Sequence, residues 1–62
     1  MKKQWIKFAK ENNYKYLIIV YDMEDKDYYP LYLNDNIENE IKNIELSIRR
    51  QEVKEIIKIG LV

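Results

Sequence analysis

The 62-residue chain contains no cysteine and no histidine, and it has one glycine, one proline and one tryptophan. Without cysteine it cannot form disulfides, and without either residue type the usual ligands of zinc are missing. A chain of this length buries about 60% of the surface that it exposes when unfolded, so its core is marginal. Small proteins with marginal cores are commonly stabilised by disulfides, a metal or oligomerisation. The sequence therefore predicts a homo-oligomer, with a dimer favoured.

Catalytic groups and long apolar runs are also scarce. Ser47 is the one serine, and histidine and cysteine are absent, so the sequence predicts a protein that is not an enzyme and uses no cofactor. The longest apolar run, residues 16–21, is far shorter than the roughly 20 residues of a membrane span. The charged residues that follow the first three do not resemble the apolar part of a secretory signal. We therefore expect no membrane association and a cytoplasmic location.

The residues that are abundant point to the kind of genome that encodes the chain. Lysine (9), asparagine (6), isoleucine (10) and tyrosine (6) make up half of the sequence, and their codons are rich in A and T. This composition is typical of low-GC bacteria and their phages. Short, cysteine-free chains are common among the accessory proteins of phages and mobile elements. The composition favours such a source, and the host cytoplasm as the location.

The net charge is zero, but the charges are segregated along the chain. Residues 1–20 hold five lysines and one glutamate, a net charge of +4. Residues 21–40 hold seven acidic residues and one lysine, a net charge of −6, and residues 41–62 carry +2. Segregated charges can guide docking to a partner, or they can neutralise one another within the chain.

A short helix is predicted near residues 3–12. Trp5, Phe8 and Ala9 share one face at i, i+3, i+4 spacing, and Ile6 flanks that face. Asn12 and Asn13 provide a stop, because asparagine tolerates the left-handed conformation that follows many helices. We expect Trp5 to anchor the helix on a sheet.

Two tyrosine-rich apolar runs, residues 14–21 and 28–33, flank a charged break, a pattern typical of a β-hairpin. The break lacks glycine, which favours a loop of four or five residues over a tight turn. Pro30 cannot donate to a strand ladder, so the second run is predicted to be an edge strand. The first run is apolar on both faces and needs cover on both. We expect the two helices to cover one face and another chain to cover the other.

A second helix is predicted to begin at Asp35, with Glu38 three residues later completing a capping box. Isoleucines recur on one side of this helix at spacings of four, three and four. The helix is expected to pack on the hairpin. Either this stripe, as the predicted oligomer interface, or a face of the sheet is expected to be buried between protomers. The members of the stripe are Ile37, Ile41, Ile44 and Ile48.

Residues 53–62 are rich in isoleucine and valine and contain Gly60, which favours a third strand over a continued helix. The sequence thus predicts one small α+β domain over residues 1–62. Its predicted order is helix, β-hairpin, amphipathic helix and short C-terminal strand (α-β-β-α-β).

The hairpin tip with its tyrosines is the main candidate for a functional surface, because tyrosine is enriched in protein interfaces. A calcium loop at the tip is disfavoured, since Lys26 occupies a ligand position and residues 22–27 include no glycine. We expect a non-enzymatic interaction module that binds and inhibits a host protein of unknown identity. The predicted interaction residues are Tyr21, Asp22, Glu24, Asp25, Asp27, Tyr28, Tyr29 and Tyr32.

The alternative function is a small nucleic-acid-binding regulator. Its phosphate contacts would come from Arg49, Arg50, Lys54 and Lys58. A nucleic-acid binder normally carries a clear basic excess. The zero net charge and the acidic middle of the chain disfavour this alternative.

Overall fold

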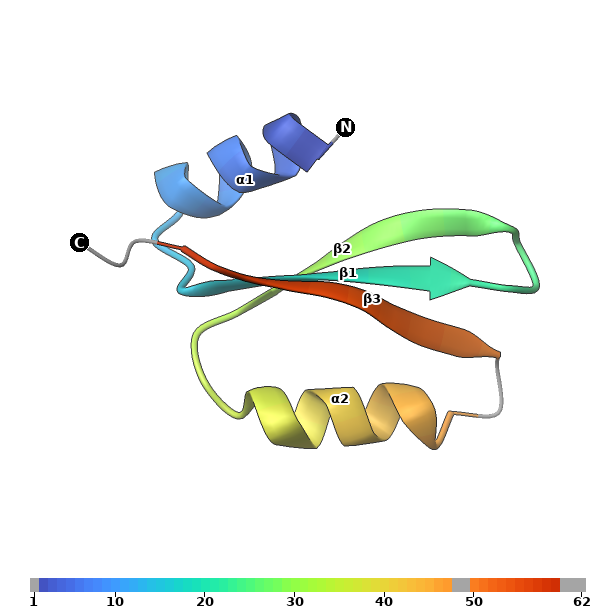
Figure 1. Cartoon of the computed structure of the whole chain (residues 1–62). Helices are drawn as coiled ribbons and strands as arrows, with labels where there is room; N and C mark the ends of the chain where they lie inside the picture. The colour runs from blue at the N-terminus through green and yellow to red at the C-terminus, as the bar shows by residue number, and fades with distance from the viewer. Residues whose placement is uncertain (1, 48–49, 60–62) are drawn as a thin grey trace.

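The computed structural model of the protein describes residues 2–47 and 50–59, and within them five elements follow one another. They are α1 (Lys2–Glu11), β1 (Tyr16–Asp22), β2 (Asp27–Leu33), α2 (Ile37–Glu45) and β3 (Gln51–Lys58). β1 lies between β2 and β3 and pairs antiparallel with both (Figure 1). The predicted α+β class and element order are confirmed, and the last segment is a strand over its described residues.

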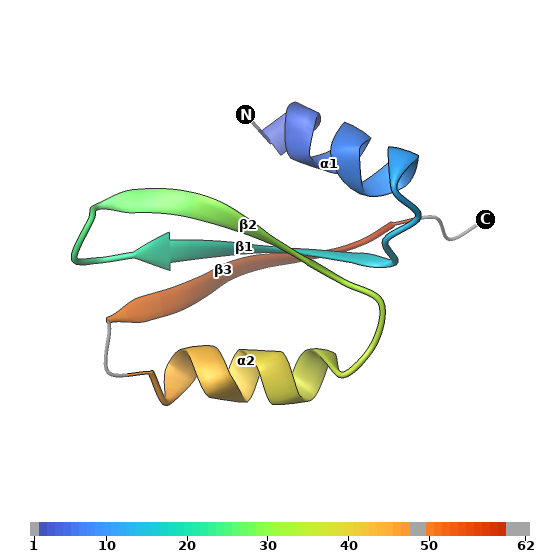
Figure 2. The same cartoon turned by 180° about the vertical axis from the view of Figure 1, so that it is seen from behind.

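The two helices lie on opposite faces of the sheet, α1 on one side and α2 on the other (Figures 1 and 2). Successive residues of β1 point to opposite faces, and its apolar residues 17–20 are all buried. Each face of this central strand therefore needs a cover of its own. The prediction that both helices cover the same face is wrong, and the chain itself covers residues 17–20 of β1 on both sides.

The core under α1 is built around Ala9, which is fully buried against the sheet. Trp5 and Ile6 pack with it, whereas Phe8 is 49% exposed. The expectation that Phe8 lies on the buried face of the helix is therefore wrong, and Ile6 takes its place. The small side chain at position 9 lets α1 approach the strands closely. The remaining members of this core are Tyr14, Leu17, Ile19, Tyr32, Ile57 and Ile59.

The core under α2 contains the isoleucine stripe. Ile44 is buried with Ile18 and Val20 of β1, and Ile37 and Ile41 pack against the same cluster. The three described members of the stripe thus pack on the sheet of their own chain, as the predicted packing of the helix on the hairpin requires. Ile48 lies outside the described residues.

The end of α1 has the predicted left-handed residue, whereas the start of α2 lacks the predicted side-chain cap. Asn13 has the left-handed conformation (φ 61°), and the N–H of Tyr14 donates to the Ala9 carbonyl (2.9 Å), as the predicted stop requires. At α2 the predicted cap at Asp35 is wrong, because the N-cap is Asn36 and no side chain caps the helix. Asn36 is left-handed (φ 57°), whereas a capping side chain works from an extended backbone.

Substitutions at Asn13 test the helix stop. Asn13→Ala is expected to lower the free energy of unfolding by about 1 kcal/mol, because alanine keeps the β-carbon but loses the short polar side chain that lets asparagine tolerate the left-handed backbone. Asn13→Gly is expected to leave it unchanged or to raise it, because glycine adopts this conformation freely. Urea denaturation followed by circular dichroism measures both changes. Equal losses for the two variants would assign the stabilisation to the asparagine side chain instead.

Candidate protein-interaction surface

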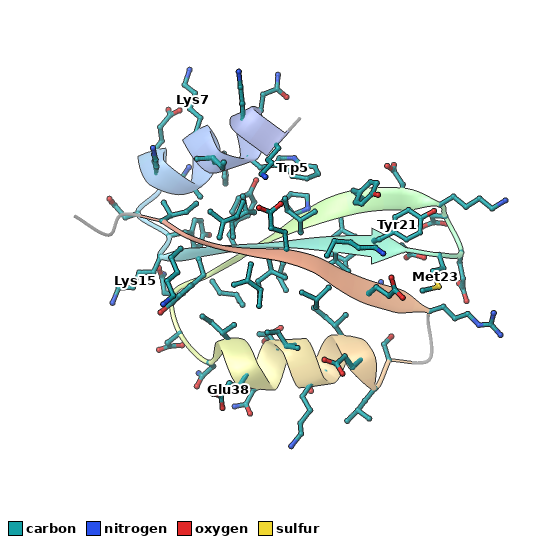
Figure 3. All side chains as sticks on the ribbon, viewed as in Figure 1. Trp5, Lys7, Lys15, Tyr21, Met23 and Glu38 are labelled. Carbon is teal, nitrogen blue, oxygen red and sulfur yellow. The ribbon has the colours of Figure 1, made fainter. Side chains whose placement is uncertain are left out.

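The α1 face of the sheet is covered over part of its length. α1 lies over the end of the sheet near the start of β1, and the part near the β1–β2 turn extends beyond the helix (Figures 1 and 2). The core under α1 accordingly reaches Leu17 and Ile19 of β1 but does not include Tyr21. Figure 3 shows Tyr21 beyond the helix, on the part of the sheet that α1 does not cover.

Four aromatic residues and one proline form a row along this face, which we call the aromatic strip. Alternate residues of β2 share a face, and they lie opposite β1 residues of the same face in the register of the hairpin. At one end of the row Phe8 joins from α1, and at the other end Tyr21 joins from β1. The strip consists of Phe8, Tyr21, Tyr28, Pro30 and Tyr32.

Ring contacts order the two ends of the strip. The ring centroids of Tyr21 and Tyr28 are 4.8 Å apart, and those of Phe8 and Tyr32 are 4.9 Å apart. Tyr14 stacks on Tyr32, with ring centroids 5.3 Å apart. Offset and tilted ring pairs at these distances are stabilising, so each end of the strip is pre-organised.

The two ends of the strip are the most exposed. Tyr28 is 48% exposed and Phe8 49%, while Tyr21, Pro30 and Tyr32 are half-buried. Burial and the neighbouring Tyr14 raise the pKa of Tyr32, so its hydroxyl is neutral at physiological pH. The strip thus presents apolar rings together with hydroxyl groups that can donate or accept hydrogen bonds.

Charged side chains from β3 border the strip. The Lys54 Nζ lies 5.7 Å from the centre of the Tyr21 ring and 2.6 Å from Glu52 Oε2. The hydrogen bond and charge of Glu52 raise the pKa of Lys54, which therefore remains a cation. Lys2 at the start of α1 pairs with Glu55 at 2.9 Å. This border carries both signs of charge.

Asp22 organises the hairpin tip. It is buried, and its Oδ1 accepts hydrogen bonds from the backbone N–H groups of Glu24 (2.9 Å) and Asp25 (3.2 Å). Its Oδ2 accepts from the Gln51 side chain (3.3 Å). The loop has four residues, 23–26, as predicted, and Lys26 at its end is left-handed (φ 54°).

The predicted interaction residues therefore fall into four groups. Tyr21, Tyr28 and Tyr32 lie together in the strip, and the side chains of Glu24, Asp25 and Asp27 are exposed at the tip next to it. Asp22 is inside the turn. Tyr29 lies on the opposite face, packed against the core under α2. Phe8 and Pro30 belong to the strip and were not among the predicted residues.

The basic residues of the alternative function are spread along β3. Arg50 precedes the strand and Lys58 ends it, so about 26 Å separates them at the usual rise of a strand. Lys54, between them, pairs with Glu52. Arg49 lies outside the described residues. The three described residues do not form one basic patch.

Other kinds of site have little support among residues 2–47 and 50–59. They contain no group of three or more acidic, histidine or cysteine side chains placed to hold a metal ion. No helix among them is long and apolar enough to cross a membrane. One shallow, open depression of about 430 Å³ lies between the start of β1 and the loop before α2. It is lined by Lys15, Tyr16 and residues 34–39.

No protein-family model matches the chain, and comparisons with curated proteins and with solved structures give no match. The surface geometry is therefore the basis of the functional proposal that follows.

Proposed function

We propose that the chain is a non-enzymatic protein-interaction module that binds another protein through the aromatic strip. The observation that carries the proposal is the half-exposure of Phe8 and Tyr28 at the two ends of an ordered aromatic row. Aromatic residues are enriched in protein interfaces, where tyrosine supplies a large contact area and a hydroxyl at a small entropic cost.

The shape and borders of the strip support a protein partner over a small ligand. Small molecules are usually enclosed in deep clefts, whereas the strip lies along a sheet surface. Its border holds the Lys54–Glu52 and Lys2–Glu55 pairs. A row of rings with a charged, hydrated border resembles the centre and rim of a protein interface.

The composition adds a proposal about the partner. If the chain comes from a phage or mobile element of a low-GC bacterium, the partner is a protein of the host cell, and binding inhibits that protein. The proposal about the partner rests on the amino-acid composition of the chain.

The strip is tested with the variant Tyr21→Ser/Tyr28→Ser. The purified wild-type chain is used to capture proteins from a low-GC bacterial lysate, and the affinity of each captured protein is then measured for wild type and variant. Loss of the two tyrosines at one end of the strip is expected to weaken binding of a genuine partner by at least about 30-fold, the effect of one interface hot spot. Circular dichroism confirms that the variant is folded.

Leu46→Ser is the matched control. Leu46 is more exposed than either strip tyrosine, but it caps the far helix α2 and lies outside the strip. This variant is expected to keep full affinity. Captured proteins that bind the tyrosine variant as tightly as wild type, or that lose affinity only with Leu46→Ser, would contradict the proposal.

A further inference from the structure

The two edges of the sheet differ in their capacity to accept another strand. β2 carries Pro30, which has no N–H to donate to a ladder. β3 contains no proline, and β1 is its one strand partner among the described residues. The outer edge of β3 therefore presents backbone N–H and C=O groups along eight residues.

A bulge in β3 sets which side chains share a face. In the pairing with β1, Ile19 lies opposite Glu55 and Val20 opposite Val53, so Lys54 is the extra residue. Lys54 contacts Tyr21 and Glu55 binds Lys2 of α1, which places both side chains on the α1 face.

The neighbours of this pair lie on the other face. Val53 packs with the core under α2, and Ile56 lies opposite Ile18, a member of the same core. The α1 face of β3 thus carries Glu52, Lys54, Glu55 and Ile57, and the α2 face carries Gln51, Val53, Ile56 and Lys58.

We propose that two copies of the chain pair antiparallel along β3 and form one continuous six-stranded sheet. A two-fold axis perpendicular to the sheet keeps each face on its own side, so paired residues must share a face. One register pairs residues of the same face along the whole strand. The two-fold axis of this register lies at the bulge. The register's pairs are Lys54 with the partner's Glu55, Val53 with the partner's Ile56, Glu52 with the partner's Ile57 and Gln51 with the partner's Lys58, and symmetry forms each pair twice.

The charges of β3 favour this register. It places Lys54 and Glu55 opposite each other twice, and it contains no pair of like charges. A shift by one residue in either direction puts Lys54 opposite itself or Glu55 opposite itself. The same register covers Ile56, which is 46% exposed in the single chain, with valine. Charge and apolar contact thus select the same pairing.

Charge reversals test the interface. Sedimentation velocity and light scattering are expected to give twice the 7.7 kDa chain mass at high concentration. Lys54→Glu and Glu55→Lys each place two pairs of like charges across the axis, so each is expected to raise the dimer dissociation constant by about tenfold or more. The double variant Lys54→Glu/Glu55→Lys restores opposite charges and is expected to restore the dimer.

Two controls separate the interface from folding and from the strip. Lys7→Glu changes a lysine that points away from the sheet (Figure 3), and it is expected to leave the dimer intact. Tyr28→Ser removes a strip residue and is also expected to leave it intact. Circular dichroism shows whether each variant is folded, and a variant that fails to fold is replaced by Lys54→Gln or Glu55→Gln, which remove the attraction without reversing it and are expected to weaken the dimer.

Three results would overturn the proposal. A monomer at the highest soluble concentration would show that charges and bulge protect the edge of β3, as they do in many sheets. A dimer that is insensitive to both single reversals would place the interface elsewhere. A dimer that both reversals weaken but the double variant does not restore would exclude the register. None of these results bears on the aromatic strip, whose test uses different residues.

Discussion

Ile44→Asp is expected to unfold the chain at room temperature. Ile44 is 7% exposed and packs against Ile18 and Val20 in the core under α2. Losing the isoleucine side chain costs about 2–5 kcal/mol, and burying an unpaired carboxylate adds several kcal/mol more. A 62-residue domain has a total stability of roughly 3–9 kcal/mol. The substitution therefore exceeds what the fold can tolerate.

Circular dichroism and one-dimensional NMR measure this effect as lost helix signal and collapsed methyl dispersion. Asn43→Asp is the matched control, because it adds the same charge at the adjacent, exposed position of the same helix. It is expected to change stability by less than about 0.5 kcal/mol. An Ile44→Asp protein with a native spectrum and unchanged melting would mean that α2 does not cover this face.

Ala9→Glu is expected to release α1 from the sheet and to destabilise the protein by at least about 3 kcal/mol. Ala9 is fully buried between α1 and the strands, so glutamate brings both excess volume and an unpaired charge into a closed contact. Glutamate is a good helix former, so the effect comes from packing and not from helix propensity.

Trp5 makes this prediction specific, because the single tryptophan packs against the same core. Its fluorescence is expected to shift to the red as the ring becomes exposed to water, and the unfolding midpoint in urea is expected to fall. Gln4→Glu adds the same charge at an exposed position of α1 and is expected to change neither signal. Unchanged tryptophan emission in Ala9→Glu would contradict the docking of α1 on this face.

Local patterns predicted much of the fold. The β-branched and aromatic runs, the glycine-free break and Pro30 predicted a hairpin with an edge strand, and the structure confirms the four-residue loop and the edge position. Asn13 ends α1 as predicted. These features depend on backbone conformations and hydrogen bonds within a few residues, which the sequence specifies directly.

The capping of α2 could not be predicted from the local sequence. The spacing of Asp35 and Glu38 fits a capping box, but the chain enters the helix through a left-handed Asn36. The direction in which the chain enters α2 is set by two constraints. The chain arrives from the end of β2, and the helix must pack on the sheet face that holds Ile18 and Val20. Capping propensity of about 1 kcal/mol is small beside the packing of three isoleucines, so the tertiary contact prevailed.

The candidate surface was predicted in part. Strand alternation alone separates Tyr29 from Tyr28, because neighbouring residues of a strand point to opposite faces. The sequence-based interpretation grouped the two, and the structure places them on different faces. Phe8 joins the strip from a distant element, and no local pattern indicates that contact. The buried role of Asp22 also depends on Gln51, which is far away in the sequence.

The sequence by itself determined the elements, their order and the need to cover both faces of β1, because these follow from composition and periodicity along the chain. The tertiary structure decided that each helix takes a separate face and that α1 leaves the end of its face near Tyr21 and Tyr28 uncovered. It also placed the bulge at Lys54. The physical reason is that long-range packing sets which face each helix covers and how β3 pairs with β1. These contacts join segments that are far apart in the sequence, so no local pattern indicates them.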